Sequence, residues 1–140
     1  MKAKRDYPKE ERRSPCPVAC GLDLLGDRWT LLVVRDLLLG RSRFKDFEAS
    51  PEGIPTNLLA DRLARLLAWG VVEQVPAGPG ARHQAYRLTV KGEALRPVVM
   101  ALRDWGLAWE PGTRVALQAR EDEPAQSAAE PPVGLAAHLL

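Results

Sequence analysis

The run from Gly53 to Thr89 constrains the fold more than any other part of this 140-residue chain. It begins with a helical pattern that ends at Gly70, and four leucines on that pattern lie within about 100° of one another on a helical wheel. These are Leu59, Leu63, Leu66 and Leu67. Two strand-like runs follow, Val71–Val75 and Gln84–Leu88, joined by a Pro- and Gly-rich segment too long for a tight turn. A two-faced helix followed by such a hairpin is typical of a winged helix-turn-helix, in which the helix enters the DNA major groove and the hairpin flanks it.

Three shorter helices are predicted before this run. The first is Pro17–Leu25 and the second is Trp29–Leu39. Ser42 is expected to cap a third helix, Arg43–Glu48, and Thr56 is expected to cap the two-faced helix after it. The apolar residues at core spacing in these short helices are Trp29, Leu32, Val33, Leu37, Phe44 and Phe47.

Beyond the hairpin the pattern predicts one long helix, Val90–Trp109, capped by Thr89. A helix of about 20 residues is about 30 Å long, and a small three-helix core cannot cover an apolar stripe of that length. The stripe is made of Leu95, Val98, Val99, Leu102, Trp105, Gly106 and Trp109. We therefore expect part of it to meet a second subunit.

Length and charge indicate a single folded domain with a basic bias. Residues 1–110 hold 18 Lys and Arg against 14 Asp and Glu, whereas residues 111–140 hold 2 against 4. The excess is modest, so we expect modest and salt-sensitive attraction to nucleic acid. Residues 1–14 are expected to form a flexible basic arm, residues 15–110 the folded domain, and the Ala- and Pro-rich residues 111–140 a disordered tail.

Other classes of protein fit the sequence poorly. No apolar run approaches the ~20 residues that span a bilayer, and the basic N-terminus has no apolar signal-peptide core. Two cysteines do not make a disulfide scaffold, nor a zinc site with the distant His83 and His138. No Ser/His/Asp or paired-carboxylate arrangement stands out. We expect a soluble, cytoplasmic protein that is not an enzyme and has no cofactor, metal or membrane partner.

Three groups of residues carry a family resemblance. The first is Cys16-Pro-Val followed by Leu24-Leu-Gly-Asp-Arg-Trp-Thr-Leu-Leu32. The second is Arg43-Phe-Lys-Asp-Phe47, Gly53-Ile-Pro-Thr-Asn-Leu-Leu59 and Arg62-Leu-Ala-Arg-Leu66. The third is Tyr86-Arg-Leu-Thr89, Lys91-Gly92 and Leu102-Arg-Asp-Trp-Gly106. In this order and at this spacing, from residue 16 to about 110, the chain resembles the HxlR-type winged-helix transcriptional regulators, relatives of the MarR group.

The resemblance implies an α+β, mostly helical fold: a winged helix-turn-helix with a two-stranded wing and N- and C-terminal dimerisation helices. It also implies a homodimer that binds a palindromic double-stranded DNA operator and regulates a nearby gene. We expect this regulation to be repression. Two positions depart from the family pattern. Ala64 replaces a residue that is often basic, and Ala85 replaces an often acidic residue before the tyrosine.

The predicted recognition helix supplies five candidate DNA contacts. Thr56 and Asn57 begin it, where their hydroxyl and amide groups can meet base edges or phosphates; the alternative is capping alone. Asp61 either accepts a hydrogen bond from a cytosine amino group or pairs with Arg65 four residues on. Arg62 and Arg65 either reach guanine or phosphate or form a solvated helix face.

The flanking elements supply four more candidates. Arg41 and Arg43 stand at the start of the preceding helix, which crosses the DNA backbone in a helix-turn-helix, so phosphate contacts are expected. Arg82 and His83 lie near the wing tip. Arg82 is expected to enter the minor groove or bind a phosphate, whereas a surface histidine such as His83 is usually only solvated.

Cys16 is a candidate redox sensor. If Pro17 is the first helical residue, Cys16 is the N-cap, and a helix N-terminus stabilises a thiolate. Some relatives with a cysteine at this position sense electrophiles or oxidants, so the resemblance implies the same role here; the alternative is a small residue packed at the dimer interface. Cys20 lies one helical turn on, too far for a disulfide without unwinding, so a bond between subunits is easier.

Two functions remain open from the sequence, and a third, a small-molecule-binding or catalytic protein, is a remote alternative. One is a homodimeric DNA-binding regulator whose operator affinity is changed by a small-molecule or oxidant effector. The other is a winged-helix module that binds another protein and has lost specific DNA recognition. The modest charge and Ala64 favour the second slightly, whereas Asn57, Arg62, Arg65 and Arg82 together favour the first more strongly.

Overall fold

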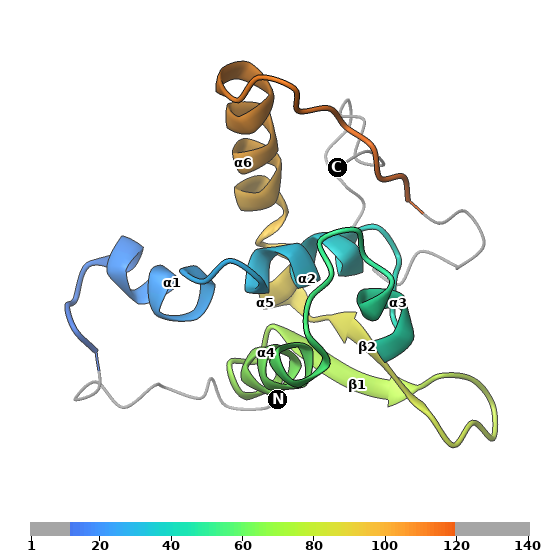
Figure 1. Cartoon of the computed structure of the whole chain (residues 1–140). Coiled ribbons are helices and arrows are strands. Elements are labelled where there is room, and N and C mark those ends of the chain that lie inside the picture. Colours follow the sequence, from blue (N-terminus) through green and yellow to red (C-terminus); the bar gives the residue numbers. More distant parts are fainter. Residues whose placement is uncertain (1–11, 120–140) are drawn as a thin grey trace.

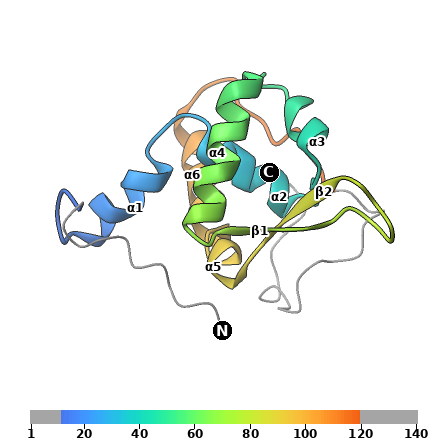
Figure 2. The same ribbon diagram turned by 90° about the horizontal axis from the view of Figure 1, so that it is seen from below.

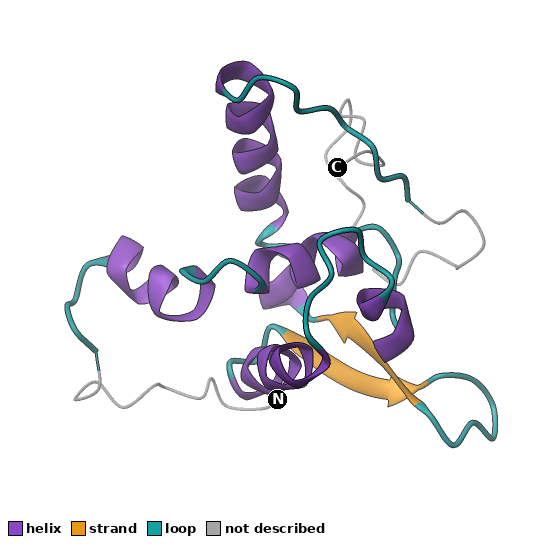
Figure 3. Ribbon diagram, viewed as in Figure 1, coloured by secondary structure: helices purple, strands orange, loops and turns teal. Residues whose placement is uncertain are grey.

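The computed structural model describes residues 12–119, so most of the expected basic arm and most of the expected disordered tail lie outside the described residues. Within this range the helices are α1 (Pro17–Leu25), α2 (Thr30–Leu38), α3 (Phe44–Glu48), α4 (Thr56–Ala68), α5 (Val90–Glu93) and α6 (Arg96–Trp109). The strands are β1 (Val72–Pro76) and β2 (Gln84–Leu88), which form one antiparallel sheet (Figure 3). The predicted fold class, a mostly helical winged helix-turn-helix, is confirmed.

Helix α2 lies at the centre of the core. Thr30 and Val34 of α2 are fully buried, and the helix contacts α1, α4, α6 and β2. The apolar face predicted for α4 is also in the core, since Leu59, Leu63 and Leu66 are almost completely buried. Because α2 touches elements on all sides, it sets the position of both the recognition helix and the C-terminal helix.

The two strands pair from Val72 opposite Leu88 to Pro76 opposite Gln84, and the segment between them forms the wing. Figure 2 looks directly at α4 and this hairpin, which lie on the same side of the molecule. The backbone N–H of Tyr86 donates to the carbonyl of Ser42 at 2.7 Å, so β2 is attached to the segment that leads into α3. This bond holds the wing against the helix-turn-helix.

Two predicted helix caps are wrong by one residue. Helix α4 has Pro55 as its N-cap and Thr56 as its first residue, because the carbonyl of Pro55 accepts the N–H of Leu59 at 2.9 Å. Helix α3 has Arg43 rather than Ser42 as its N-cap. Here the carboxylate of Asp46 accepts the backbone N–H of Arg43 at 3.0 Å, which satisfies a donor at the helix start.

The predicted long helix from Val90 to Trp109 is two helices. The cap at Thr89 is confirmed, since its hydroxyl accepts the N–H of Gly92 at 3.2 Å. The helix then breaks at residues 94–95, and Pro97 lies in the first turn of α6. Proline has no N–H to donate to the carbonyl of Glu93, and its ring clashes with that carbonyl in a continuous helix.

Helices α1 and α6 project from the rest of the molecule, α1 to one side and α6 away from α4 and the wing (Figure 1). After α6 the chain turns back, and Leu117 and Ala119 pack against the core. This ordered packing differs from the disorder predicted from residue 111 onward. Within residues 12–119, no helix has the length and apolar character needed to cross a membrane.

The helix-to-sheet junction yields a stability prediction. Gly92 lies so close to the sheet that an added Cβ would overlap the carbonyl oxygen of Val71 and lie 2.8 Å from Leu88 Cδ2. We expect Gly92→Ala to lower the free energy of unfolding by about 1–3 kcal/mol in urea titrations, because overpacking forces the backbone to shift. Gly106→Ala is the control, since a Cβ there meets nothing within 4 Å. Equal stabilities for the two variants would contradict the prediction.

Candidate nucleic-acid interface

The N-terminal end of α4 is exposed and carries polar side chains that have no hydrogen-bond partner among the described residues. Thr56 and Asn57 are both exposed, and no side-chain hydrogen bond is found for either within residues 12–119. The predicted capping role for Thr56 is therefore absent, and its hydroxyl is available to an external partner. The N–H groups of the first turn point out of the same end and favour an anion.

Small residues line the exposed face of α4 beyond this first turn. Ala60, Asp61 and Ala64 are exposed and continue the face that begins at Asn57. Ala60 was missed in the sequence because its methyl group carries no polar signal. An alanine on such a face can contact the methyl group of thymine, and its small size lets the helix approach base edges closely.

Arg62 is committed to contacts within the chain. Its Nε donates to Asp27 Oδ2 at 2.7 Å, its Nη1 pairs with Asp61, and its side chain is only 16% exposed. Asp27 also accepts the backbone N–H of Trp29 at 3.1 Å and the hydroxyl of Thr30, at the start of α2. Asp27 thus joins the start of α2 to the middle of α4.

Asp27 was missed as a site residue, although an aspartate shortly before a helix is a known turn signal. Burial alone would raise the pKa of Asp27. The hydrogen bonds from Thr30, Arg62 and the N–H of Trp29 outweigh burial, so the net pKa lies below its ordinary value. The carboxylate is therefore held in its charged form, which keeps Arg62 paired.

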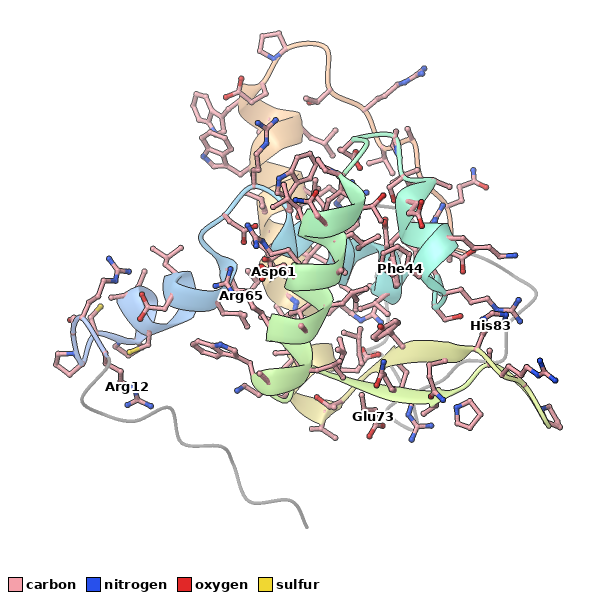
Figure 4. All side chains as sticks on the ribbon, turned by 60° about the horizontal axis from the view of Figure 1, so that its bottom comes forward. Arg12, Phe44, Asp61, Arg65, Glu73 and His83 are labelled. Atoms are coloured by element: carbon pink, nitrogen blue, oxygen red, sulfur yellow. The ribbon has the colours of Figure 1, made fainter. Side chains whose placement is uncertain are left out.

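Arg65 holds α1 against the recognition helix. Its Nη2 donates to the main-chain carbonyl of Asp23 in α1 at 2.8 Å, and Figure 4 shows Arg65 on α4 at the side nearest α1. The carboxylate of Asp23 in turn accepts Arg13 Nε at 2.7 Å. The expected alternative pair between Asp61 and Arg65 is not formed, since Asp61 pairs with its neighbour Arg62.

The two arginines before α3 have different surroundings. Arg43 is exposed at the start of α3. Arg41 is half-buried, and its Nη1 is buried without a hydrogen-bond partner among the described residues. Burial raises the pKa of the nearby Asp36 above its ordinary value. The hydrogen bonds from Ser50 and Arg35 and the charge of Arg41 lower this pKa, but they do not outweigh burial. Arg43 is the better placed of the two to meet DNA.

The wing carries the remaining candidates. Arg82 and His83 are both exposed near its tip, and Figure 4 shows His83 at the far end of the hairpin from α5. Ala85 is buried opposite Val75, one pair from the loop end of the hairpin. Arg87 Nε forms an ion pair across the two strands with Glu73 Oε1 at 2.5 Å. This pair is next to the pair of Gln74 and Tyr86 in the sheet.

Cys16 is the N-cap of α1, as the sequence predicts, and its side chain is exposed. The backbone N–H groups of Ala19 and Val18 lower the pKa of its thiol. Cys20 is half-buried, and its thiol donates to the carbonyl of Ser14 at 3.2 Å. Cys16 is therefore the more accessible of the two cysteines, and its surroundings favour the reactive thiolate.

Large apolar side chains are exposed on the two projecting helices. On α6 they include Val98, Leu102, Trp105 and Trp109, with Trp109 71% exposed. Val18 and Leu22 of α1 are also exposed, and these two were not singled out in the sequence. Val99 is instead buried in the core of the protomer, and Leu95 packs against that core.

The fold and the exposed end of α4 beside a wing define a winged helix-turn-helix protein. The family model described as HxlR-like helix-turn-helix matches residues 24–113. The chain belongs to this family.

Two similar proteins illustrate the relationship. MT3179, an HTH-type transcriptional regulator of Mycobacterium tuberculosis, is 37% identical over 89 residues, which are 64% of this chain and 56% of that protein. The chain therefore spans little more than half the length of this relative. YodB, an HTH-type transcriptional regulator of Bacillus subtilis, is 33% identical over 71% of this chain and 91% of its own.

Solved structures agree with the fold. The structure of PA1607 superposes with a TM-score of 0.69 at 39% identity and covers 89% of each chain. The reduced form of YodB superposes with a TM-score of 0.59 at 32% identity and covers 71% of this chain and 100% of YodB. The same arrangement of helices and wing thus recurs in regulators of this family.

Asp27 generates a pH-dependent prediction. We expect Asp27→Asn to lower the free energy of unfolding by about 1–2 kcal/mol at pH 7, because Arg62 loses its charged partner. The folded-state pKa of Asp27 is lowered, so its contribution is present above the ordinary carboxyl pKa and is lost as pH falls through the folded value. The difference between variant and wild type in urea titrations should therefore shrink below about pH 4.

The matched control is Asp104→Asn, which removes the partner of Arg103 but whose carboxylate is 65% exposed. An exposed pair contributes little, so this change should cost less than about 1 kcal/mol. A pH-independent loss in Asp27→Asn would show that the charge of Asp27 is not what stabilises the fold.

Proposed function

We propose that the chain is a sequence-specific DNA-binding transcriptional regulator that acts as a homodimer. The observation that carries this is the exposed N-terminal end of α4, where Thr56 and Asn57 have no partner within residues 12–119. In this proposal α4 enters the major groove. Asn57 contacts a base edge, Thr56 contacts a base or phosphate, and Asp61 accepts from a cytosine amino group.

The flanking groups anchor the helix on the duplex. Arg43 contacts a phosphate beside the groove, and Arg82, with His83 next to it, binds the minor groove or a phosphate through the wing. Arg62 and Arg65 serve as positioning residues, because their guanidinium groups bind Asp27 and the carbonyl of Asp23. Arg41, half-buried beside Asp36, supports the turn more than it contacts DNA.

The proposed dimer forms through the exposed apolar residues of the projecting helices α1 and α6. Such a patch in a small protein marks an interaction surface, and tryptophans are enriched in such surfaces. A two-fold dimer would present two copies of α4, which matches a palindromic operator. Repression follows if that operator overlaps a promoter.

The proposed trigger is the thiol of Cys16. Its position at the start of α1 lowers its pKa and leaves it exposed to oxidants. Helix α1 is joined to α4 through Arg65, so a displacement of α1 on oxidation would reach the recognition helix. YodB, a relative, has been solved in quinone-bound and diamide-treated forms, which supports testing the same chemistry here.

DNA recognition is tested by fluorescence anisotropy with DNA from upstream of the protein's own gene, a scrambled competitor and two salt concentrations. We expect tight binding that survives the competitor. Asn57→Ala should weaken it about tenfold, as for the loss of one good base contact of about 1–3 kcal/mol. Arg82→Ala should weaken it and lower the salt slope by about one. Arg114→Ala, an exposed arginine beyond α6, should change neither.

Equal binding to both DNAs, lost together as salt rises, would reveal only phosphate attraction. The protein-interaction module would then be the better assignment, and partner binding would survive Asn57→Ala.

The thiol trigger gives a separate prediction. Diamide should weaken operator binding by wild-type protein at least tenfold and leave Cys16→Ser unaffected, because serine can occupy the N-cap position but cannot be oxidised by diamide. Cys20→Ser is the matched control and should respond as wild type does. The idea fails if Cys16→Ser loses operator affinity on diamide treatment to the same extent as wild type.

A further inference from the structure

A cavity of about 320 Å³ lies between α2, α6 and the segment that follows α6. Figure 1 shows that segment leaving the end of α6 and turning back toward α2 and α3. Its apolar lining includes Leu31, Leu32, Val99, Leu102, Val115 and Leu117. Ligand pockets occupy about 300–1,000 Å³ and are mostly apolar with a few polar groups. The size and the lining therefore fit a small organic ligand.

Gly106 opens one wall of this cavity. A glycine inside a helix costs about 0.5–1 kcal/mol relative to alanine. Gly106 lies within α6, and a Cβ there would meet no atom within 4 Å. No packing within the described protomer explains this glycine, so the space before it is suited to a group from outside the chain.

The polar lining favours an anion. Three arginines and one carboxylate line the cavity: Arg35, Arg103, Arg114 and Glu52. Arg35 bonds Glu52 at 2.6 Å and Asp36 at 3.0 Å, and Arg103 pairs with Asp104 at 2.9 Å. For Arg114, no hydrogen bond or ion pair is found in the part of the chain that the structure describes. Its guanidinium can bind a carboxylate in a bidentate manner.

We propose that this cavity binds an apolar monocarboxylic acid. The apolar body lies against the leucines and Gly106, and the carboxylate pairs with Arg114. As an effector site the proposal rests on the proposed regulatory function. The bound acid would contact both α2 and α6. Helix α2 positions α4, and α6 carries the proposed dimer surface. The binding itself requires neither DNA nor the thiol.

The test is isothermal titration calorimetry on the DNA-free full chain with octanoate and phenylbutyrate, each compared with its primary amide. The amide keeps the apolar body and removes the charge. We expect saturable binding of the acids at one per chain and at least tenfold weaker binding of the amides.

Two variants locate the site. Gly106→Leu fills the cavity and should abolish binding of both acids, with folding checked by circular dichroism and thermal unfolding. Arg114→Gln changes an exposed residue, so it does not depend on the packing of the core. It should weaken the acids at least fivefold and leave the amides unchanged. Arg12→Gln, an exposed arginine outside the cavity, is the matched control and should bind as wild type does.

Several results would overturn the proposal: no saturable binding, equal affinity for acid and amide, or full affinity in both cavity variants. If neither acid binds and Gly106→Leu lowers the dimer fraction in gel filtration, the cavity belongs to an interface between two copies of the chain. The calorimetry contains no DNA, so a protein that fails to bind an operator could still bind the acids. Equally, a protein that fails to bind the acids could still bind the operator in the anisotropy titration.

Discussion

The bond between Asp27 and Arg62 is the contact that ties the middle of α4, the helix proposed to meet DNA, to the start of α2. The carboxylate of Asp27 accepts hydrogen bonds from the backbone N–H of Trp29 and the hydroxyl of Thr30 at the start of α2. The same carboxylate accepts a hydrogen bond from the guanidinium of Arg62. Because α2 contacts α1, α6 and β2 as well as α4, this bond helps to orient α4 relative to those elements. The N-terminal end of α4 is left exposed, while its flank is tied down.

Much of the fold was predictable because its signals are local. The leucine spacing of α4 predicted its buried face, and Thr89 predicted the start of α5. Two of the errors came from prolines: Pro55 took the capping position expected for Thr56, and Pro97 divided the last helix. Both effects follow from the fixed φ and the missing N–H of a single proline, so the start of α4 and the break before α6 could have been predicted from these two residues.

The candidate site was less predictable, because it depends on contacts between distant segments. A helical wheel places Arg62 and Arg65 on the flank and outer face of α4 but does not say what lies beside them. Their partners stand 35 and 42 residues earlier in the chain. In the same way, periodicity grouped Val99 with the exposed stripe of α6, although α2 packs over it. Asn57 lies on the exposed face of α4, as the helical wheel predicts, and its role in DNA binding stays a prediction.

The contact from Arg65 to α1 ends on a main-chain oxygen rather than on a side chain. Every amino acid at position 23 supplies that oxygen, so mutations along α1 can accumulate without detaching it from α4. If α1 forms part of the surface between protomers, duplicated copies of the gene could diverge in their pairing preferences while the attachment to α4 persists. Related regulators in one cell could then avoid forming mixed dimers through changes in α1 alone.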